Sequence, residues 1–293
     1  MLVRVPATSA NLGPGFDTLG LALNMHNYFE VTKDTSYSLT LTGEGANIPK
    51  LLRNNNFVKI FKDVYIKLGG DPNENFRFNL KNNIPISRGL GSSSAIIIGA
   101  ISCAYKMLNK PFKKDSILKT ALEYESHPDN ITPACNGGFN VTVVKNKKVF
   151  YIKTYIPDDI KAVIVIPNRS ISTSYARKIL PKQYTSCDAI FNLSLSSMLT
   201  GIFISKSWNL LKIANEDRFH QDKRMALYPI LFTVRKEACK HGALMSVLSG
   251  SGSTFLNICY RDDAKKLNNI LSNKFPDFRV LSLDFDNTGI LFK

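Results

Sequence analysis

Residues 85–95 form a glycine- and serine-rich stretch that leads directly into an apolar run ending near Leu108. Glycine tolerates the positive φ angles that turn successive backbone N–H groups toward one point. A helix that starts within this stretch adds the partial positive charge of its N-terminus. The combination predicts an anion-binding loop suited to a nucleotide phosphate, with an ordinary strand-to-helix turn as the alternative. The spacing matches neither GxxxxGK[ST] nor GxGxxG.

Two other segments are also polar and rich in glycine. Residues 8–17 follow the first predicted strand and are polar and rich in glycine, and residues 249–253 read Ser-Gly-Ser-Gly-Ser between two apolar strands. Alone, the first segment is typical of a turn and the second of a flexible hairpin loop. The alternative for the second is a further close approach of the backbone to a ligand.

Hydrophobic periodicity predicts a mixture of strands and helices. Strands are expected at residues 2–6, 29–32 and 37–41, the last two as antiparallel strands. The other predicted elements are helices at 57–68, 93–108, 115–125 and 262–274, strands at 75–80, 139–144, 148–153, 162–166, 243–248, 254–260 and 279–283, and a mostly helical stretch at 172–241. Because helices and strands do not alternate strictly, the fold class is predicted to be α+β.

Composition narrows the classes of function. The 293 residues carry a net charge of +15 without a basic tail or block, so a solvated surface or an anionic ligand is favoured over a nucleic-acid partner. Five cysteines, none closer than 20 residues to another, fit a reducing cytosol rather than a disulfide framework or a zinc site. No apolar segment reaches the ~20 residues expected of a membrane span, and the N-terminus lacks the apolar core of a signal peptide.

The three loops, in this order, resemble the three signature motifs of the GHMP small-molecule kinases. Residues 6–20 (PATSANLGPGFDTLG) and 126–133 (SHPDNITP) resemble the homoserine kinase branch in particular. The third motif departs from the family at Ser253, where proline is usual, which predicts a less rigid loop. The resemblance implies a ribosomal-protein-S5-like, nucleotide-binding domain over residues 1–155 and a ferredoxin-like domain over residues 156–293.

The resemblance also implies a reaction. ATP would phosphorylate the side-chain hydroxyl of L-homoserine with the help of Mg²⁺, a cytoplasmic step toward threonine; no nucleic-acid or membrane partner is expected, and a homodimer is compatible with the family. The ATP-binding residues would be Pro85, Ile86, Ser87, Arg88, Gly89, Leu90, Gly91, Ser92, Ser93, Ser94, Ala95 and Asn56. The residues that bind the zwitterionic substrate would be Asn11, Asp17, His127, Thr173, Arg177 and Arg224.

By the same resemblance, Ser93 and Glu123 would hold the metal, with Glu125 as a competing ligand. Magnesium takes few protein oxygens, so two such residues suffice. Asn130 would orient the acceptor hydroxyl without acting as a base, and Asp129 is the candidate general base. The alternative for Asp129 is a helix cap.

Two other functions remain open from the sequence. Another GHMP kinase, acting on mevalonate or on diphosphocytidyl-methylerythritol, would not need the pair Arg177 and Arg224 together with Asp17. A non-catalytic relative that binds a nucleotide or a nucleic acid is disfavoured because Ser93, Glu123 and the glycine–serine loop are intact.

Overall fold

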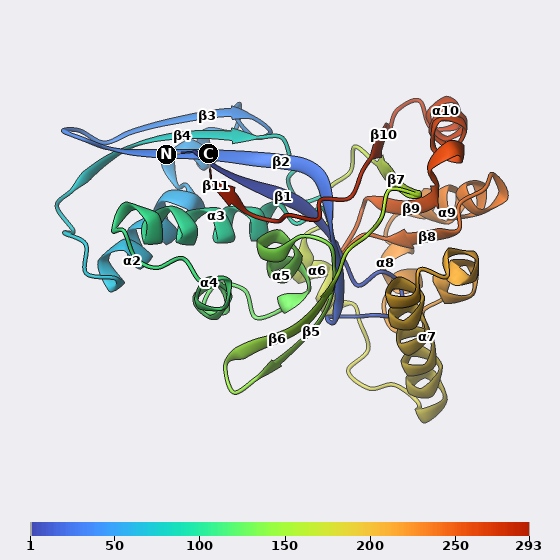
Figure 1. The fold of residues 1–293 in the computed structure, drawn as a ribbon. Coiled ribbons are helices and arrows are strands. Elements are labelled where there is room, and N and C mark those ends of the chain that lie inside the picture. The colour runs from blue at the N-terminus through green and yellow to red at the C-terminus, as the bar shows by residue number, and fades with distance from the viewer. Residues whose placement is uncertain (1, 293) are drawn as a thin grey trace.

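The computed structural model describes residues 2–292, and within them the chain forms two β-sheets that lie side by side (Figure 1). The strands of the first sheet are β1 Leu2–Ala10, β2 Leu19–Asp34, β3 Ser38–Gly43, β4 Asn75–Asn82, β5 Phe139–Lys145, β6 Lys148–Thr154 and β11 Leu291–Phe292. Their order is β11-β1-β2-β4-β3, and β5 pairs with both β2 and β6. The predicted α+β class is confirmed.

The predicted antiparallel pairing of residues 29–32 with 37–41 is wrong. β4 lies between β2 and β3, and it pairs antiparallel with β2 but parallel with β3. A parallel pair needs a crossover connection, and α1 (Pro49–Arg53) and α2 (Asn56–Lys67) supply it. Alternation of side chains indicates a strand but carries no information about its partner.

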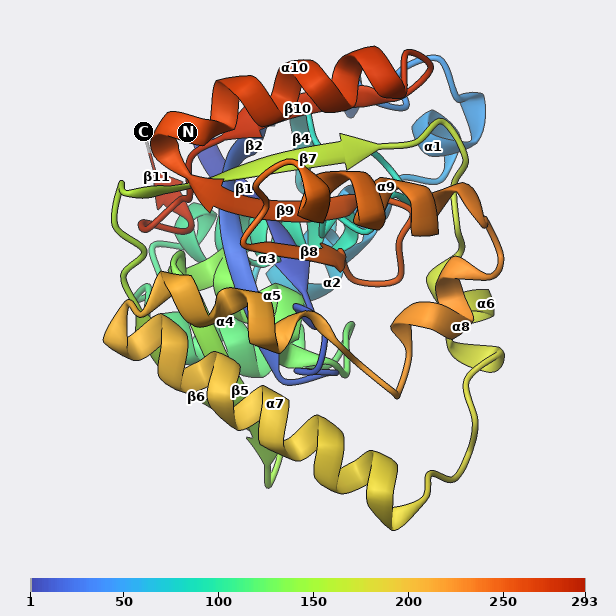
Figure 2. The ribbon, with the colours of Figure 1, turned by 90° about the vertical axis from the view of Figure 1, so that its right-hand side faces the viewer.

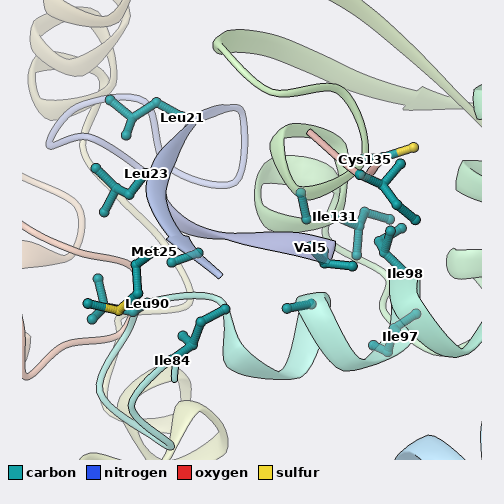
Figure 3. Packing of buried hydrophobic residues seen from close by; sticks show 14 of the residues in the cluster. Val5, Leu21, Leu23, Met25, Ile84, Leu90, Ile97, Ile98, Ile131 and Cys135 are labelled. Atoms are coloured by element: carbon teal, nitrogen blue, oxygen red, sulfur yellow. The ribbon is translucent and has the colours of Figure 1, made fainter. Parts of the chain in front are cut away.

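Helices α2 to α5 cover one face of the first sheet (Figure 1). They include α3 (Ser92–Met107), α4 (Lys114–Ala121) and α5 (Pro128–Asn136). Figure 3 shows Val5 of β1 packed near Ile97 and Ile98 of α3 and Ile131 of α5, all of them buried. The predicted helix over residues 115–125 ends at Ala121, which leaves Glu125 in the turn before α5.

The second sheet has the order β10-β7-β9-β8, with every neighbouring pair antiparallel. Its strands are β7 Ile160–Ile166, β8 Met245–Leu248, β9 Phe255–Tyr260 and β10 Arg279–Leu283. When the four strands are numbered in chain order, this order is 4-1-3-2 with the second strand, β8, at the edge. This is the ferredoxin-like arrangement. Helices α9 (Ile230–Lys240) and α10 (Ala264–Lys274) lie against this sheet (Figure 2).

Four further helical segments lie between β7 and α9. They are α6 Thr173–Lys178, α7 Ser186–Ser205, a 3₁₀ segment Trp208–Asn215 and α8 Gln221–Met225. Among residues 2–292, α7 is the one helix long and apolar enough to cross a membrane, judged by length and composition, and 22% of its most apolar window is buried. The expectation that no apolar segment reaches the length of a membrane span is therefore wrong for the 20 residues of α7.

Candidate active site

The glycine–serine loop leads from β4 into α3 with a left-handed backbone at Ser87, Gly89 and Gly91. Gly91 is the N-cap residue of α3, so the helix N-terminus opens at the loop. A Cβ atom on Gly89 would lie 2.1 Å from the Ser249 carbonyl oxygen, and one on Gly91 would lie 1.8 Å from Thr8 Oγ1. Both glycines are therefore required by the close approach of the other two loops as well as by their own φ angles.

Backbone hydrogen bonds hold the three loops together. Thr8 N–H donates to Leu90 O, Gly250 N–H to Ala10 O and Thr254 N–H to Arg88 O, at 3.0 to 3.1 Å. At the position where the family has proline, Ser253 donates its hydroxyl hydrogen bond to Arg169 O at 2.5 Å. The three motifs that are far apart in the sequence thus form one continuous structure between the two sheets.

A cavity of about 260 Å³ opens beside the glycine–serine loop. Ten of the expected ATP-binding residues, Pro85 to Ser94, line it, and so does Asn56 at the start of α2. Ala95 is buried and does not reach the wall. The other lining residues are Leu41, Leu51, Asn55, Asn82, Ile96, Glu125, Asn130, Thr173, Gly250 and Ser251.

Arg88 also borders the cavity, but its guanidinium is engaged elsewhere. It donates hydrogen bonds to Pro167 O at 3.0 Å and to Asn168 O at 2.6 Å, beyond the end of β7. In this arrangement Arg88 ties the loop to the second sheet.

Asp17 lies at the centre of the expected substrate residues. Arg177 donates two hydrogen bonds to its carboxylate, at 2.9 and 2.8 Å, and His127 Nδ1 lies 4.0 Å from Oδ2. The backbone N–H of Asp17 donates to Asn11 Oδ1 at 3.0 Å. Burial opposes ionisation of Asp17, but the bonds from Arg177 and its positive charge hold the pKa of this carboxyl below its usual value.

Arg224 is buried on the other side of the same loop. It donates hydrogen bonds to Ala176 O at 3.2 Å and to Gly250 O at 3.0 Å. Burial, followed by the charge of Arg177, lowers the pKa of Arg224 to about 10, so the side chain remains a cation at neutral pH. The ring of Phe16 lies 5.3 Å from the guanidinium carbon of each arginine and separates the two.

Thr173 connects the substrate residues to the cavity. It lines the cavity, and its hydroxyl lies 3.2 Å from the hydroxyl of Ser251 in the third loop. The amide of Asn11 also reaches the third loop, where it donates to Gly250 O at 3.0 Å. All six expected substrate residues therefore belong to one cluster at the edge of the cavity.

The two candidate metal-binding glutamates have different surroundings. Glu123 is exposed, lies outside the cavity wall and pairs with Lys67 Nζ at 3.0 Å. Glu125 lines the cavity together with Ser93, and its Oε1 accepts a hydrogen bond from the backbone N–H of His127 at 3.2 Å. The structure thus brings Glu125, and not Glu123, to the glycine–serine loop.

Asn130 and Asp129 occupy the first turn of α5. Asn130 lines the cavity, whereas the side chain of Asp129 is 4% exposed and does not. Burial raises the pKa of Asp129 to about 7, and the carboxylates of Asp17 and Glu125 act in the same direction. The N-cap residue of α5 is His127, so Asp129 is not the helix cap.

Thr8, Phe16 and His220 contact these side chains but were not singled out from the sequence. Thr8 donates its hydroxyl hydrogen bond to Asn130 Oδ1 at 2.7 Å. His220 Nε2 lies 2.9 Å from Gly13 O, and burial lowers the pKa of this histidine to about 4, which keeps the ring neutral. The sequence did offer a signal for Thr8, which is a polar residue at the end of an apolar strand. It offered none for His220, because only the fold brings this residue to the first loop.

Known proteins resemble this chain over its whole length. The family model for the GHMP kinases N terminal domain matches residues 55–138, and the model for GHMP kinases C terminal matches residues 199–277. Homoserine kinase of Wolinella succinogenes is 56% identical over 99% of both chains, and homoserine kinase of Helicobacter pylori strain 26695 is 52% identical over 100% of this chain and 99% of that protein.

Solved structures agree with this relationship. Homoserine kinase from Cytophaga hutchinsonii superposes with a TM-score of 0.87 at 25% identity, covering 99% of this chain and 96% of that one. A mevalonate kinase structure, at 18% identity and a TM-score of 0.73, shares the fold. From the two matched domains and the identity to full-length relatives, the chain belongs to the homoserine kinases, a branch of the GHMP kinase family.

Proposed function

We propose that this protein transfers the γ-phosphoryl group of ATP to the side-chain hydroxyl of L-homoserine, giving O-phospho-L-homoserine for threonine biosynthesis. The observation that carries the proposal is the Asp17–Arg177 pair, which hydrogen bonds through Asn11 connect to Gly250 in the wall of the cavity beside the glycine–serine loop. One part of the site has both charges that an amino acid requires, and the adjoining part has the helix N-terminus that phosphates require. The cytosol, which supplies ATP and keeps thiols reduced, is the expected compartment.

The bound amino acid would replace the ion pair between Arg177 and Asp17. In the free enzyme Arg177 and Asp17 satisfy each other. A bound zwitterion would place its ammonium group on Asp17 and its carboxylate on Arg177, with Arg224 as the second cation across Phe16. Charge-assisted hydrogen bonds of this kind are roughly twice as strong as neutral ones.

Replacing Arg177 by lysine is expected to raise the KM for homoserine at least ~10-fold while the KM for ATP changes little. Lysine keeps the positive charge but loses the two parallel N–H donors, at a cost of about 1–3 kcal/mol. Initial-rate kinetics with each substrate varied in turn would measure both constants. Equal increases for homoserine and ATP would show that Arg177 maintains the structure rather than the substrate site.

The nucleotide would lie along the glycine–serine loop in the domain of residues 1–155, with Asn56 near its base, while Arg177 and Arg224 reach the site from residues 156–293. Ser93 and Glu125 fit a magnesium ion, since they offer a hydroxyl and a carboxylate on the same cavity wall. Bound Mg²⁺ neutralises charge on the phosphates. The loop N–H groups would hold the phosphates in place, and Asn130 would align the acceptor hydroxyl.

Asn130 lines the cavity, and its Oδ1 accepts a hydrogen bond from the Thr8 hydroxyl at 2.7 Å. With Oδ1 engaged in this way, the NH₂ group of the amide would be available as a donor. Asn130 would then donate to an oxygen, either of the acceptor hydroxyl or of the phosphoryl group. An amide cannot remove a proton at neutral pH, so this geometry supports transfer without an obligatory side-chain base. A loose transition state needs little proton removal before the P–O bond breaks.

Replacing Asp129 by asparagine is expected to change kcat less than ~10-fold, well below the 10²–10⁴ that general-base catalysis is typically worth. The pKa near 7 suits a base, but the carboxyl is buried away from the cavity wall.

The Asp129→Asn variant should also be more stable than the wild type. Because the folded pKa is raised above the unfolded one, wild-type stability falls as the pH rises from about 4 to 7, and the variant escapes this loss.

Melting temperatures at pH 5 and pH 8 would detect that effect. The gain in the free energy of unfolding at pH 8 should be on the order of a few kcal/mol. A 10³-fold loss of kcat in this variant, with the homoserine KM and the melting temperature unchanged, would instead make Asp129 the general base.

A panel of acceptors tests the function as a whole. ADP release would be measured with L-homoserine, mevalonate, shikimate and galactose under identical conditions. Homoserine is expected to have the highest kcat/KM by orders of magnitude. Comparable turnover of mevalonate would overturn the proposal and favour another GHMP kinase activity.

A further inference from the structure

His220 is buried between the first loop and Arg224. It is the N-cap residue of α8, and its side chain is fully enclosed. The ring stacks on Phe16 with the centroids 5.1 Å apart, and its Nε2 lies 2.9 Å from Gly13 O. Its other nitrogen, Nδ1, lies 3.3 Å from Nη1 of Arg224. The ring therefore contacts both the loop that carries Asp17 and the second arginine of the substrate cluster.

The two polar contacts determine the tautomer of His220. A carbonyl oxygen can only accept, so Nε2 must carry the hydrogen and donate it to Gly13 O. A guanidinium can only donate, so Nδ1 must keep its lone pair and accept from Arg224. Burial lowers the pKa of His220 to about 4, so the ring is neutral and meets both requirements. A second hydrogen, on Nδ1, would face an N–H group and a positive charge.

Asp217 does not compete for the Nε2 hydrogen. Its Oδ2 lies 3.7 Å from Nε2, which is longer than a hydrogen bond. The carboxylate is already saturated by four N–H donors at 2.6 to 2.9 Å, which are the backbone N–H groups of Phe219, His220 and Gln221 and the side-chain amide of Asn192. The Nε2 hydrogen therefore stays on the first loop.

Arg224 is held by two of its three guanidinium nitrogens. Nε donates to Ala176 O at 3.2 Å, on α6, which lies beside α8 (Figure 2). The two hydrogens of Nη1 go to Gly250 O at 3.0 Å and to His220. Within residues 2–292, Nη2 makes no hydrogen bond. With Nε and Nη1 held, the plane of the guanidinium is set and Nη2 is available to a carboxylate.

We propose that His220 is a positioning residue for the substrate carboxylate: its Nδ1 accepts from Arg224 and holds the guanidinium in the orientation that L-homoserine requires. The inference rests on the proposed function. Without Nδ1, one hydrogen of Nη1 loses its acceptor, and the buried guanidinium turns toward another one. Because a single rigid ring spans Arg224 and Gly13, it also keeps the second cation at a constant distance from the loop of Asp17.

Two amide variants separate the two hydrogen bonds of His220. The amide nitrogen of glutamine can occupy the position of Nε2 and donate to Gly13 O, but no atom replaces Nδ1. The amide oxygen of asparagine can occupy the position of Nδ1 and accept from Arg224, but the side chain is too short to reach Gly13.

Initial-rate kinetics are expected to distinguish these variants. His220→Gln should raise the KM for homoserine ~10-fold or more while the KM for ATP stays within about twofold, because a hydrogen bond to a charged group is lost. His220→Asn should keep the KM for homoserine within about threefold of the wild type. His241→Gln is the matched control, since His241 lies at the C-terminal end of α9 and pairs with Glu237; it should leave both constants unchanged.

A double variant tests whether His220 acts through Arg224. In an Arg224→Met background the guanidinium is absent, so adding His220→Gln should change the kcat/KM for homoserine by less than about twofold. Effects that multiply in the double variant, equal losses in His220→Gln and His220→Asn, or a KM for ATP that rises as much as that for homoserine would overturn the proposal and make His220 a structural residue.

Nitrogen-15 NMR of the wild type gives a readout that does not depend on a variant folding. The ring of His220 should carry hydrogen on Nε2 and none on Nδ1 at neutral pH, above its pKa of about 4. Hydrogen on Nδ1 would exclude the bond from Arg224 and overturn the proposal. A wild type that fails to phosphorylate L-homoserine would contradict the proposed function, whereas wild-type turnover with an unchanged KM in His220→Gln would contradict only this inference.

Discussion

Gly91→Val is expected to reduce ATP affinity at least ~100-fold while the protein remains folded. Gly91 has a φ of +67°, and its Cβ would lie 1.8 Å from Thr8 Oγ1 and 3.2 Å from Asn130 Oδ1. A β-branched residue at positive φ costs about 1–3 kcal/mol of folding stability, which is less than the stability of a typical domain. The side chain also displaces the N-terminus of α3 from the phosphates. Isothermal titration with a non-hydrolysable ATP analogue would measure the loss.

Gly69→Val is the control for this experiment. Gly69 has a φ of +96°, but a Cβ atom there meets nothing within 4 Å. It therefore shares the backbone strain of Gly91→Val without the contact at the loop. Wild-type ATP affinity in a folded Gly91→Val protein would remove the glycine–serine loop from the nucleotide site, whatever the melting temperatures show.

Glu125→Ala is expected to lower kcat/KM on the order of 100-fold or more, and to raise the Mg²⁺ concentration needed for half-maximal rate. The variant removes one of the two protein oxygens that we place on the metal, and even outer partners of metal sites are worth about 10–100-fold. A magnesium titration at saturating ATP and homoserine separates this effect from a loss of substrate affinity.

Glu123→Ala is the matched control, because it deletes the same side chain two residues away. Glu123 is exposed and pairs with Lys67, and exposed ion pairs contribute little. We expect its rate to stay within about twofold of the wild type. The opposite ranking, with Glu123→Ala the slower enzyme, would assign the metal to Glu123 and would contradict the geometry of the cavity.

Much of the local structure was accessible from the sequence. The helices predicted at residues 57–68 and 93–108 occur within one residue of their expected positions, because their apolar residues recur at helical spacing and Gly69 and Gly91 flank them. The hairpin over residues 139–153 was also correct, since Asn146 and Lys147 both adopt the positive φ that a tight turn requires. Motifs that are contiguous in the sequence were likewise enough to identify the family.

Long-range partners were not accessible in this way. The residue that bonds Asn130 is Thr8, 122 positions away, and the residue that pairs with Asp17 is Arg177, 160 positions away. The parallel pairing of β3 with β4, and the two-residue strand β11 on the edge of β1, also depend on distant segments. A pattern of residues within one short segment cannot predict a contact with a residue outside that segment.

Local sequence was enough to predict the three loops, the helix that follows the glycine–serine loop and the membership of the family, because backbone conformation and helical periodicity are encoded by neighbouring residues. That Glu125 rather than Glu123 reaches the cavity, and that Asp129 lies behind its wall, depends on the tertiary structure. The early end of α4 at Ala121 places Glu125 in a turn, and the direction of α5 buries one of two adjacent side chains while exposing the other to the cavity. Both outcomes depend on where whole elements pack, and no local pattern carries that information.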